Sequence, residues 1–167
     1  GAMAVEVRDA TAGDFAGCHR CLDLVSQEGR WLSRQSAPPL ERYTAFATSL
    51  QAINAPHIVA IDSDVVGWCD ITPDVSPIRA HVGSLGMGLI ASHRGQGIGR
   101  RLLTLAIDRA RDRGFERIEL SVLHDNDVAR ALYRRLGFQM EGRRVRDWKH
   151  DGVYRDSVLM ALNLCAN

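Results

Sequence analysis

A glycine-rich segment that follows an apolar run constrains this chain more than any other stretch. Residues 85–90 are apolar or glycine, Gly95, Gly97 and Gly99 stand at alternate positions, and a helical pattern of apolar and basic residues follows. Glycine tolerates left-handed backbone angles, so a turn built on these residues can curl until its N–H groups converge. The next helix adds the positive end of its dipole at the same place. The segment therefore predicts a strand, a phosphate-binding turn and a helix in succession.

The composition favours one globular domain. The chain has 167 residues, of which 46% are apolar and 25% charged, and its net charge is +1. This length can bury a sizeable core, and the proportions are ordinary for a globular protein. A net charge near zero creates no field that attracts nucleic acid or an acidic surface. No apolar run approaches the roughly 20 residues of a membrane-spanning helix. We therefore predict neither a nucleic-acid nor a membrane partner.

The ends and the cysteines suggest where the domain begins and in which compartment it works. Gly1-Ala2-Met3 resembles the scar of a cleaved expression tag and not a secretory signal, so we assign residues 4–167 to a single domain. The four cysteines lack the spacing of a disulfide framework, which favours the cytoplasm; they are residues 18, 21, 69 and 165. Cys18 and Cys21 form a C-x-x-C without a second ligand pair, so we expect core-facing thiols and no metal.

Hydrophobic periodicity predicts four helices and seven strands. A capping-box pattern from Thr11 to Asp14 opens a helix that runs to about Gln27, and a second helix begins near Pro39. The other expected elements are helices over 98–113 and 125–136 and strands over 5–8, 57–61, 64–71, 81–90, 115–122, 138–145 and 153–162. The order β-α-α-β-β-β-α-β-α-β-β predicts an α/β (α+β) fold. Its mixed sheet of six or seven strands is flanked by about four helices, and strands 81–90 and 115–122 are parallel.

Two segments, in this order and at a matching interval, resemble the GCN5-related N-acetyltransferases, the GNAT superfamily. Arg94-Gly-Gln-Gly97-Ile-Gly99 fits the R/Q-x-x-G-x-G/A signature of that family. Residues 126–138 fit its N-x-x-A-x-x-L-Y-x-x-x-G-F segment. The tail 141–160 resembles members that acetylate small amines, including L-amino acids and phosphinothricin. The expected element order also matches the family along nearly the whole chain, so the resemblance implies the GNAT fold.

The resemblance also implies an activity and a cofactor site. It implies direct transfer of an acetyl group from acetyl-CoA, the co-substrate, to a primary amine of a small molecule. The backbone of Met87, Gly88 and Leu89 would pair with the pantetheine arm. Asn126 would bind the same arm, and Tyr133 would lie by the thioester sulfur as general acid. The pyrophosphate would bind the backbone amides of Arg94, Gly95, Gln96, Gly97, Ile98, Gly99 and Arg100.

Several of these residues also have a structural alternative. Tyr133 adjoins the apolar stripe of its helix and could simply pack there, although a pKa of about 10 would let it protonate a departing thiolate. Asn126 stands at the N-cap of the same helix. Gly83, Gly86 and Gly88 weaken a strand, which favours a bulge or the close approach of a ligand backbone. We predict function for Tyr133 and Asn126.

The base that removes a proton from the acceptor amine is left open by the sequence. Many GNAT members carry a glutamate on the strand before the phosphate turn, where this chain has Gly83 and Leu85. The candidate bases here are His81, Asp70 and Glu28. His81 has the most suitable unperturbed pKa, yet a lone histidine on a strand is usually structural. An acceptor of low pKa or a chain of waters would also serve.

The sequence also leaves open which amine is the acceptor substrate. In the family, the loop between the first two helices and a hairpin near the C-terminus line the acceptor site. Arg30 is a candidate clamp for a carboxylate and Trp31 a cover for an apolar side chain, with Arg34 in the same loop. The basic residues of 143–149 also fit a solvated hairpin. We predict an amino acid or an amino-acid-like xenobiotic as acceptor. The alternatives are a protein N-terminus or lysine and a non-catalytic acyl-CoA-binding sensor, and a homodimer is left open.

Overall fold

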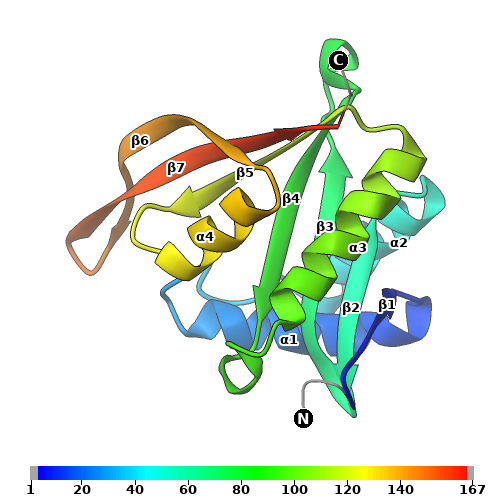
Figure 1. The fold of residues 1–167 in the computed structure, drawn as a ribbon. Coiled ribbons are helices and arrows are strands. Elements are labelled where there is room, and N and C mark those ends of the chain that lie inside the picture. Colours follow the sequence, from blue (N-terminus) through cyan, green and yellow to red (C-terminus); the bar gives the residue numbers. More distant parts are fainter. Residues whose placement is uncertain (1–3, 165–167) are drawn as a thin grey trace. The chain divides into compact units, whose positions relative to one another are not determined.

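The computed structural model describes residues 4–164, and its seven strands follow the order β1-β2-β3-β4-β5-β7-β6 in one mixed sheet (Figure 1). The predicted tag scar at 1–3 and Cys165 lie outside the described residues. The predicted fold class and element order are confirmed. The main elements are β1 Glu6–Asp9, α1 Phe15–Gln27, α2 Leu40–Ala52, β2 His57–Asp62, β3 Asp64–Pro73, β4 Val82–Leu89, α3 Ile98–Arg113, β5 Arg117–Leu123, α4 Asp127–Arg135, β6 Gln139–His150 and β7 Val153–Asn163.

The chain divides into two compact units, each built from two separate stretches. The first unit runs to Thr72 and resumes over Gly86–Gly114, and the second holds Pro73–Leu85 and resumes at Phe115. The first half of β4 therefore belongs to the second unit, and its second half to the first unit.

In the first unit, β1, β2 and β3 form an antiparallel sheet with helices on both faces. Helices α1 and α2 cover one face and α3 the other (Figure 1). The predicted capping box is present, since the Thr11 amide donates to Asp14 Oδ2 at 2.8 Å. Gly114 closes α3 in a left-handed conformation (φ 97°), as expected of a C-terminal glycine. The core between the sheet and α1 and α2 includes Phe15, Cys18, Tyr43, Ala47 and Val59.

The cysteines of the first unit are core residues. Cys18 and Cys21 are each 1% exposed and are free thiols. Burial raises the pKa of each thiol to about 12, so both stay protonated at neutral pH. The expectation of core-facing thiols in the C-x-x-C segment is confirmed.

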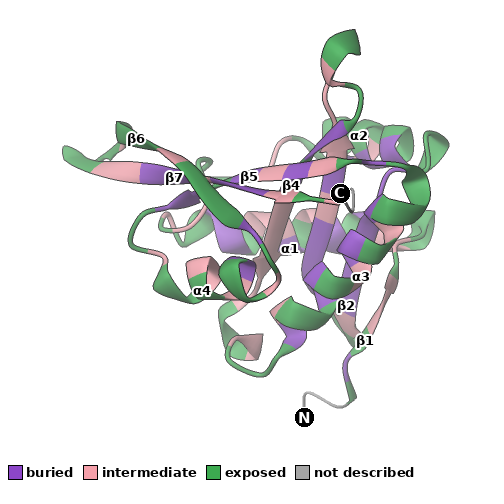
Figure 2. Ribbon diagram, turned by 45° about the horizontal axis from the view of Figure 1, so that its top comes forward, coloured by how far each residue is buried: buried purple, intermediate pink, exposed green. Residues whose placement is uncertain are grey.

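In the second unit, β5 lies between β4 and β7. Its parallel pairing with β4 runs from Val82↔Arg117 to Ser84↔Glu119, which confirms the predicted parallel pair. Strand β6 is longer than the predicted 138–145, because Asp151 (φ 51°) and Gly152 (φ 76°) close a tight two-residue hairpin to β7. Most of β6 is exposed (Figure 2).

A tight contact between β3 and β4 explains one of the strand glycines. A Cβ atom on Gly88 would lie 2.3 Å from Cη2 of Trp68, closer than real contacts allow. Trp68 is 6% exposed and packs with Cys21 and Val25. Gly88 therefore leaves room for the indole ring, whereas the sequence had suggested a bulge or a ligand backbone.

We predict that Gly88→Ala lowers the free energy of unfolding by about 1–3 kcal/mol, because the new methyl group overpacks the buried indole. Urea titration followed by far-UV circular dichroism measures the change. Gly13→Ala is the matched control, since its Cβ would meet only Thr11 Oγ1, at 3.8 Å. Equal stability of the two variants would contradict this explanation of Gly88.

Candidate functional site

The glycine turn, residues 94–100, has the geometry of an anion site. Gly95 (φ 75°) and Gly97 (φ 82°) are left-handed, and Gly97 is the N-cap of α3. Ile98, the first residue of α3, is fully buried and anchors the turn to the core. None of the backbone amides from Gly95 to Arg100 donates a hydrogen bond to any residue that the structure describes. Unpaired amides at a helix N-terminus are the groups that bind phosphate.

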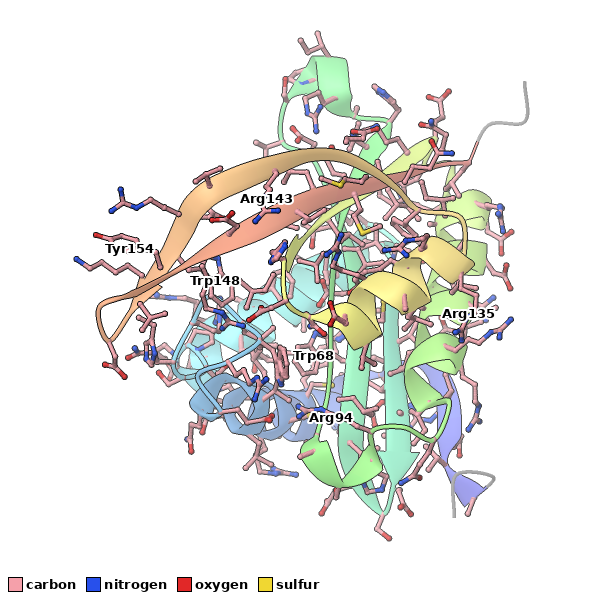
Figure 3. The ribbon with its side chains drawn as sticks, turned by 60° about the vertical axis from the view of Figure 1, so that its left-hand side comes forward. Trp68, Arg94, Arg135, Arg143, Trp148 and Tyr154 are labelled. Atoms are coloured by element: carbon pink, nitrogen blue, oxygen red, sulfur yellow. The ribbon has the colours of Figure 1, made fainter. Side chains whose placement is uncertain are left out.

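The side chains of Arg94 and His93 hold the glycine turn within the first unit. The Arg94 guanidinium donates to both carboxylate oxygens of Glu28, at 2.7 and 2.6 Å, and its Nε donates to the carbonyl of Leu89 at 2.9 Å. Just before the turn, His93 Nε2 lies 2.8 Å from Asp62 Oδ2 in the β2–β3 hairpin. Arg94 therefore contacts α1 and the end of β4 (its side chain is labelled in Figure 3).

A cavity of about 740 Å³ opens in the same unit. It lies among the end of α1, the loop 32–39, the start of α2, and the strands β3 and β4. Its walls are apolar in large part, with a few charged groups among them. The lining residues are Leu22, Leu32, Ser33, Arg34, Ser36, Ala37, Pro38, Pro39, Arg42, Tyr43, Phe46, Trp68, Asp70, Gly86 and Met87.

Asp70 is the carboxyl group of this cavity. A Cβ atom on Gly86 would lie 3.4 Å from its Oδ1, so glycine at 86 keeps this carboxyl uncovered. No described residue donates a hydrogen bond to it, and none forms an ion pair with it. Burial raises the pKa of Asp70 to about 7. A carboxyl that titrates near neutrality is suited to accept a proton from a substrate.

The other candidate bases are placed differently. Glu28 is occupied by Arg94 and does not line the cavity. His81 is an exposed residue of the second unit that precedes β4, and its carbonyl accepts bonds from the Glu116 and Arg117 amides. Of the three candidates, Asp70 is the one in the cavity wall.

Of the residues predicted to bind the acceptor substrate, only some line the cavity. Arg30 lies over the Trp31 ring at 4.5 Å, and neither residue lines the cavity, whereas Arg34 does. Sequence reasoning missed Arg42. Its spacing of four from Phe46, on the first turns of α2, is the signal that could have found it.

Some basic side chains of the β6–β7 hairpin, in the second unit, contact acidic or aromatic side chains. Arg143 forms an ion pair with Asp156 at 2.6 Å, and Arg146 lies 3.9 Å over the Tyr154 ring. Figure 3 labels Arg143, Trp148 and Tyr154 along β6 and β7. These contacts fit the reading of a charged, solvated hairpin.

The structural alternatives for Asn126 and Tyr133 are both observed in the second unit. Asn126 Oδ1 accepts the Ala129 amide at 3.2 Å as the N-cap of α4. Tyr133 is 7% exposed, and its ring centroid lies 5.6 Å from that of Phe138. Their roles toward a cofactor stay predictions.

Comparison with known proteins decides the family. The sequence model of the family described as "Acetyltransferase (GNAT) family" matches residues 20–138. The chain belongs to the GNAT family. It is therefore an N-acetyltransferase that uses acetyl-CoA. The crystal structure of a GNAT-family acetyltransferase from Streptococcus pneumoniae is 26% identical, with a TM-score of 0.89 over 96% of this chain and 99% of that one.

Three curated relatives are named for different acceptors. N-alpha-acetyltransferase RimI of Mycobacterium tuberculosis is 44% identical over 156 residues, 90% of this chain and 92% of that protein. L-amino acid N-acetyltransferase AaaT of Escherichia coli is 31% identical over 105 residues, 62% of this chain and 65% of its own length. An L-methionine sulfoximine/L-methionine sulfone acetyltransferase of Pseudomonas aeruginosa is 25% identical over 97% of this chain and 96% of that one.

The described part of this GNAT chain has neither a cluster of metal-ligating side chains nor a helix that could span a membrane. Across residues 4–164 no three His, Cys, Asp or Glu side chains gather as metal ligands would. In the same range, no helix combines the length and the apolar character needed to cross a membrane.

We predict that Asp70 makes stability depend on pH. The unfolded carboxyl has a pKa near 3.8 and the folded one about 7, so between these values the folded protein holds a proton that the unfolded chain releases. Stability due to this group is therefore present at low pH and lost as pH rises through about 7. The free energy of unfolding of Asp70→Asn should rise relative to the wild type over this range, by up to about 4 kcal/mol. Urea titrations across the range measure the difference, and a constant difference would contradict the raised pKa.

Proposed function

We propose that this N-acetyltransferase transfers the acetyl group to the primary amine of an amino acid or an amino-acid-like small molecule, with Asp70 as general base. The observation that carries the proposal is the carboxyl of Asp70, which stands in the wall of the cavity, where burial raises its pKa to about 7. Met87 of β4, the strand that leads to the glycine turn, lines the same cavity.

The reaction removes two protons from the acceptor nitrogen. An amine is largely protonated at neutral pH, so Asp70 first takes one N–H proton from the ammonium group and later releases it to solvent. The freed lone pair forms a C–N bond to the thioester carbonyl carbon. When the tetrahedral intermediate collapses, the C–S bond breaks and the thiolate takes a proton from Tyr133. The second N–H proton then restores the tyrosine hydroxyl, and the products are the amide, CoA thiol and one proton.

The cofactor assignments follow the family resemblance and have support in each unit. The unpaired amides of the glycine turn, residues 94–100, suit the two phosphates of acetyl-CoA. The parallel pairs of β4 with β5 end at Ser84, which supports the proposal that the backbone of 87–89 pairs with the pantetheine arm. Asn126 uses Oδ1 as a cap, so its amide NH₂ is the group we assign to the cofactor arm.

The cavity lining supports an acceptor that carries both a carboxylate and an apolar side chain. Arg34 and Arg42 supply positive charge, and arginine is the preferred partner of a carboxylate. Leu22, Leu32, Phe46 and Trp68 supply apolar wall. The two amino-acid-acetylating relatives support the same class. A protein N-terminus is the second candidate, since the more similar M. tuberculosis relative is an N-alpha-acetyltransferase.

A panel of acceptors tests the proposal. Release of CoA thiol is followed at neutral pH with free amino acids, their amides and short peptides. We expect turnover to be highest with free apolar amino acids. Binding of acetyl-CoA without turnover on any free amino acid, together with turnover on peptides, would establish the second candidate instead.

We predict that Asp70→Asn lowers kcat by about 10²-fold or more, because the acceptor then loses its base. The acidic limb of the pH–rate profile should disappear with it. Asp64→Asn, at an exposed residue of the β2–β3 hairpin, is the control and should keep wild-type rates. An unchanged profile in Asp70→Asn would exclude Asp70 as the base.

We predict that Tyr133→Phe lowers kcat more than it weakens binding of acetyl-CoA. Phenylalanine keeps the packing against Phe138 but cannot protonate the thiolate. Steady-state kinetics and acetyl-CoA titration of the same preparation measure the two effects. Unchanged turnover would leave Tyr133 with a packing role alone.

We predict that Arg42→Ala raises KM for a free amino acid by about tenfold or more, through loss of a charged hydrogen bond. KM for the corresponding amino-acid amide, which lacks the carboxylate, should change little. Equal changes for the two acceptors would show that Arg42 does not recognise the carboxylate.

Two expectations about the whole protein stay predictions. Free buried thiols at Cys18, Cys21 and Cys69 support a reducing compartment such as the cytoplasm. A homodimer is to be tested by light scattering.

A further inference from the structure

We propose that Glu28 is a positioning residue for acetyl-CoA, which acts through Arg94 on the glycine turn and not as the base. The inference rests on the proposed function only in assigning the pyrophosphate to that turn.

The first observation is the geometry of the pair. Glu28 accepts two short hydrogen bonds from the Arg94 Nη1 and Nη2 atoms, and Arg94 Nε donates to the Leu89 carbonyl. The two side chains are 30% and 34% exposed, so the pair is partly shielded from water. A bidentate arginine–carboxylate pair fixes direction as well as distance. Arg94, directly before Gly95, is thereby held in one orientation.

The second observation is where the pair sits. Arg94 is the first residue of the turn, and Leu89 is the last residue of β4. Gly95 and Gly97 permit many backbone conformations, so the turn itself does little to select the one in which its amides converge. Fixing the turn before acetyl-CoA arrives reduces the ordering cost of binding.

The third observation is that the same helix anchors the cavity loop. Asp23 Oδ1 accepts the Ala37 amide at 2.9 Å, and His19 Nε2 lies 2.7 Å from the Pro38 carbonyl. Both contacts join α1 to the loop 32–39 in the cavity wall, and Glu28 is the C-cap of the same helix. Within the first unit, residues in the middle of α1 therefore bond to the loop 32–39, and the C-cap of α1 bonds to the glycine turn.

The occupied carboxylate also argues against Glu28 as the base. To accept a proton from an amine it would have to release two charge-assisted hydrogen bonds, and it does not line the cavity. Asp70 has neither obstacle.

The test uses two acetyl donors. Acetyl-CoA carries the pyrophosphate, whereas S-acetyl-pantetheine has the same thioester without it. In Glu28→Ala we expect KM and Kd for acetyl-CoA to rise about fivefold, the size expected for a well-formed, partly exposed pair. Kinetics with S-acetyl-pantetheine should match the wild type, and kcat at saturating acetyl-CoA should change less than twofold. Glu28→Gln, which keeps one acceptor oxygen, should fall between the two proteins.

Asp9→Ala is the matched control. It removes a similar bidentate pair of the same unit, in which Arg109 Nε and Nη2 donate to Asp9 at 3.0 and 2.9 Å, far from the turn in sequence. Its acetyl-CoA kinetics should not change.

Three results would overturn the inference. Unchanged KM and Kd for acetyl-CoA in Glu28→Ala would mean that the pair has only a structural role. Equal losses with both donors would mean that its effect does not pass through the pyrophosphate. A fall of about 10²-fold in kcat with an altered pH profile would make Glu28 the base. Failure of the proposed function itself shows separately, as normal turnover by Asp70→Asn.

Discussion

Two glycines on β4 face two large or charged side chains on β3, and the candidate site depends on this fit. Gly88 leaves room for the Trp68 indole, and Gly86 leaves the Asp70 carboxyl open. Because side chains alternate along a strand, Trp68 and Asp70 share one face of β3, as Gly86 and Gly88 share one face of β4. A buried aromatic ring thus fills the space beside Gly88, and the carboxyl of Asp70, two residues away, stands in the wall of the cavity.

Leaving polar groups unpaired costs free energy, which a ligand can recover. The glycine turn has amides without partners, and Asp70 has a carboxyl without one. The first arrangement suits an anion and the second a protonated amine. Both lie in the first unit, where the ion pair of Glu28 and Arg94 ties α1 to the turn. These unpaired groups are therefore available to bind a ligand.

Local sequence signals predicted the fold well. Each of these signals affects only the few residues around it. They are the capping box at Thr11, the terminal Gly114 of α3 and the left-handed glycines of the turn. The strand predicted over 138–145 is only the first part of β6, and the rest was missed because its exposed, charged residues carry no alternating apolar pattern before Asp151 and Gly152 turn the chain back.

The site was harder to predict, because its decisive features are tertiary. The sequence offered three candidate bases, and Asp70 is distinguished from Glu28 and His81 by its place in the wall of the cavity. The pair of Glu28 and Arg94 joins residues 66 positions apart, which no local pattern reveals. The reason for Gly88 likewise lies on another strand.

The central claim is that Asp70 holds its proton near neutral pH, and its own titration tests this directly. Aspartate labelled with ¹³C at the side-chain carboxyl gives one resonance per residue, and the spectrum of Asp70→Asn identifies that of Asp70. We expect this resonance to titrate with a midpoint near pH 7, since burial raises the pKa of Asp70 to about 7. A midpoint near the ordinary aspartate pKa of about 4 would contradict it.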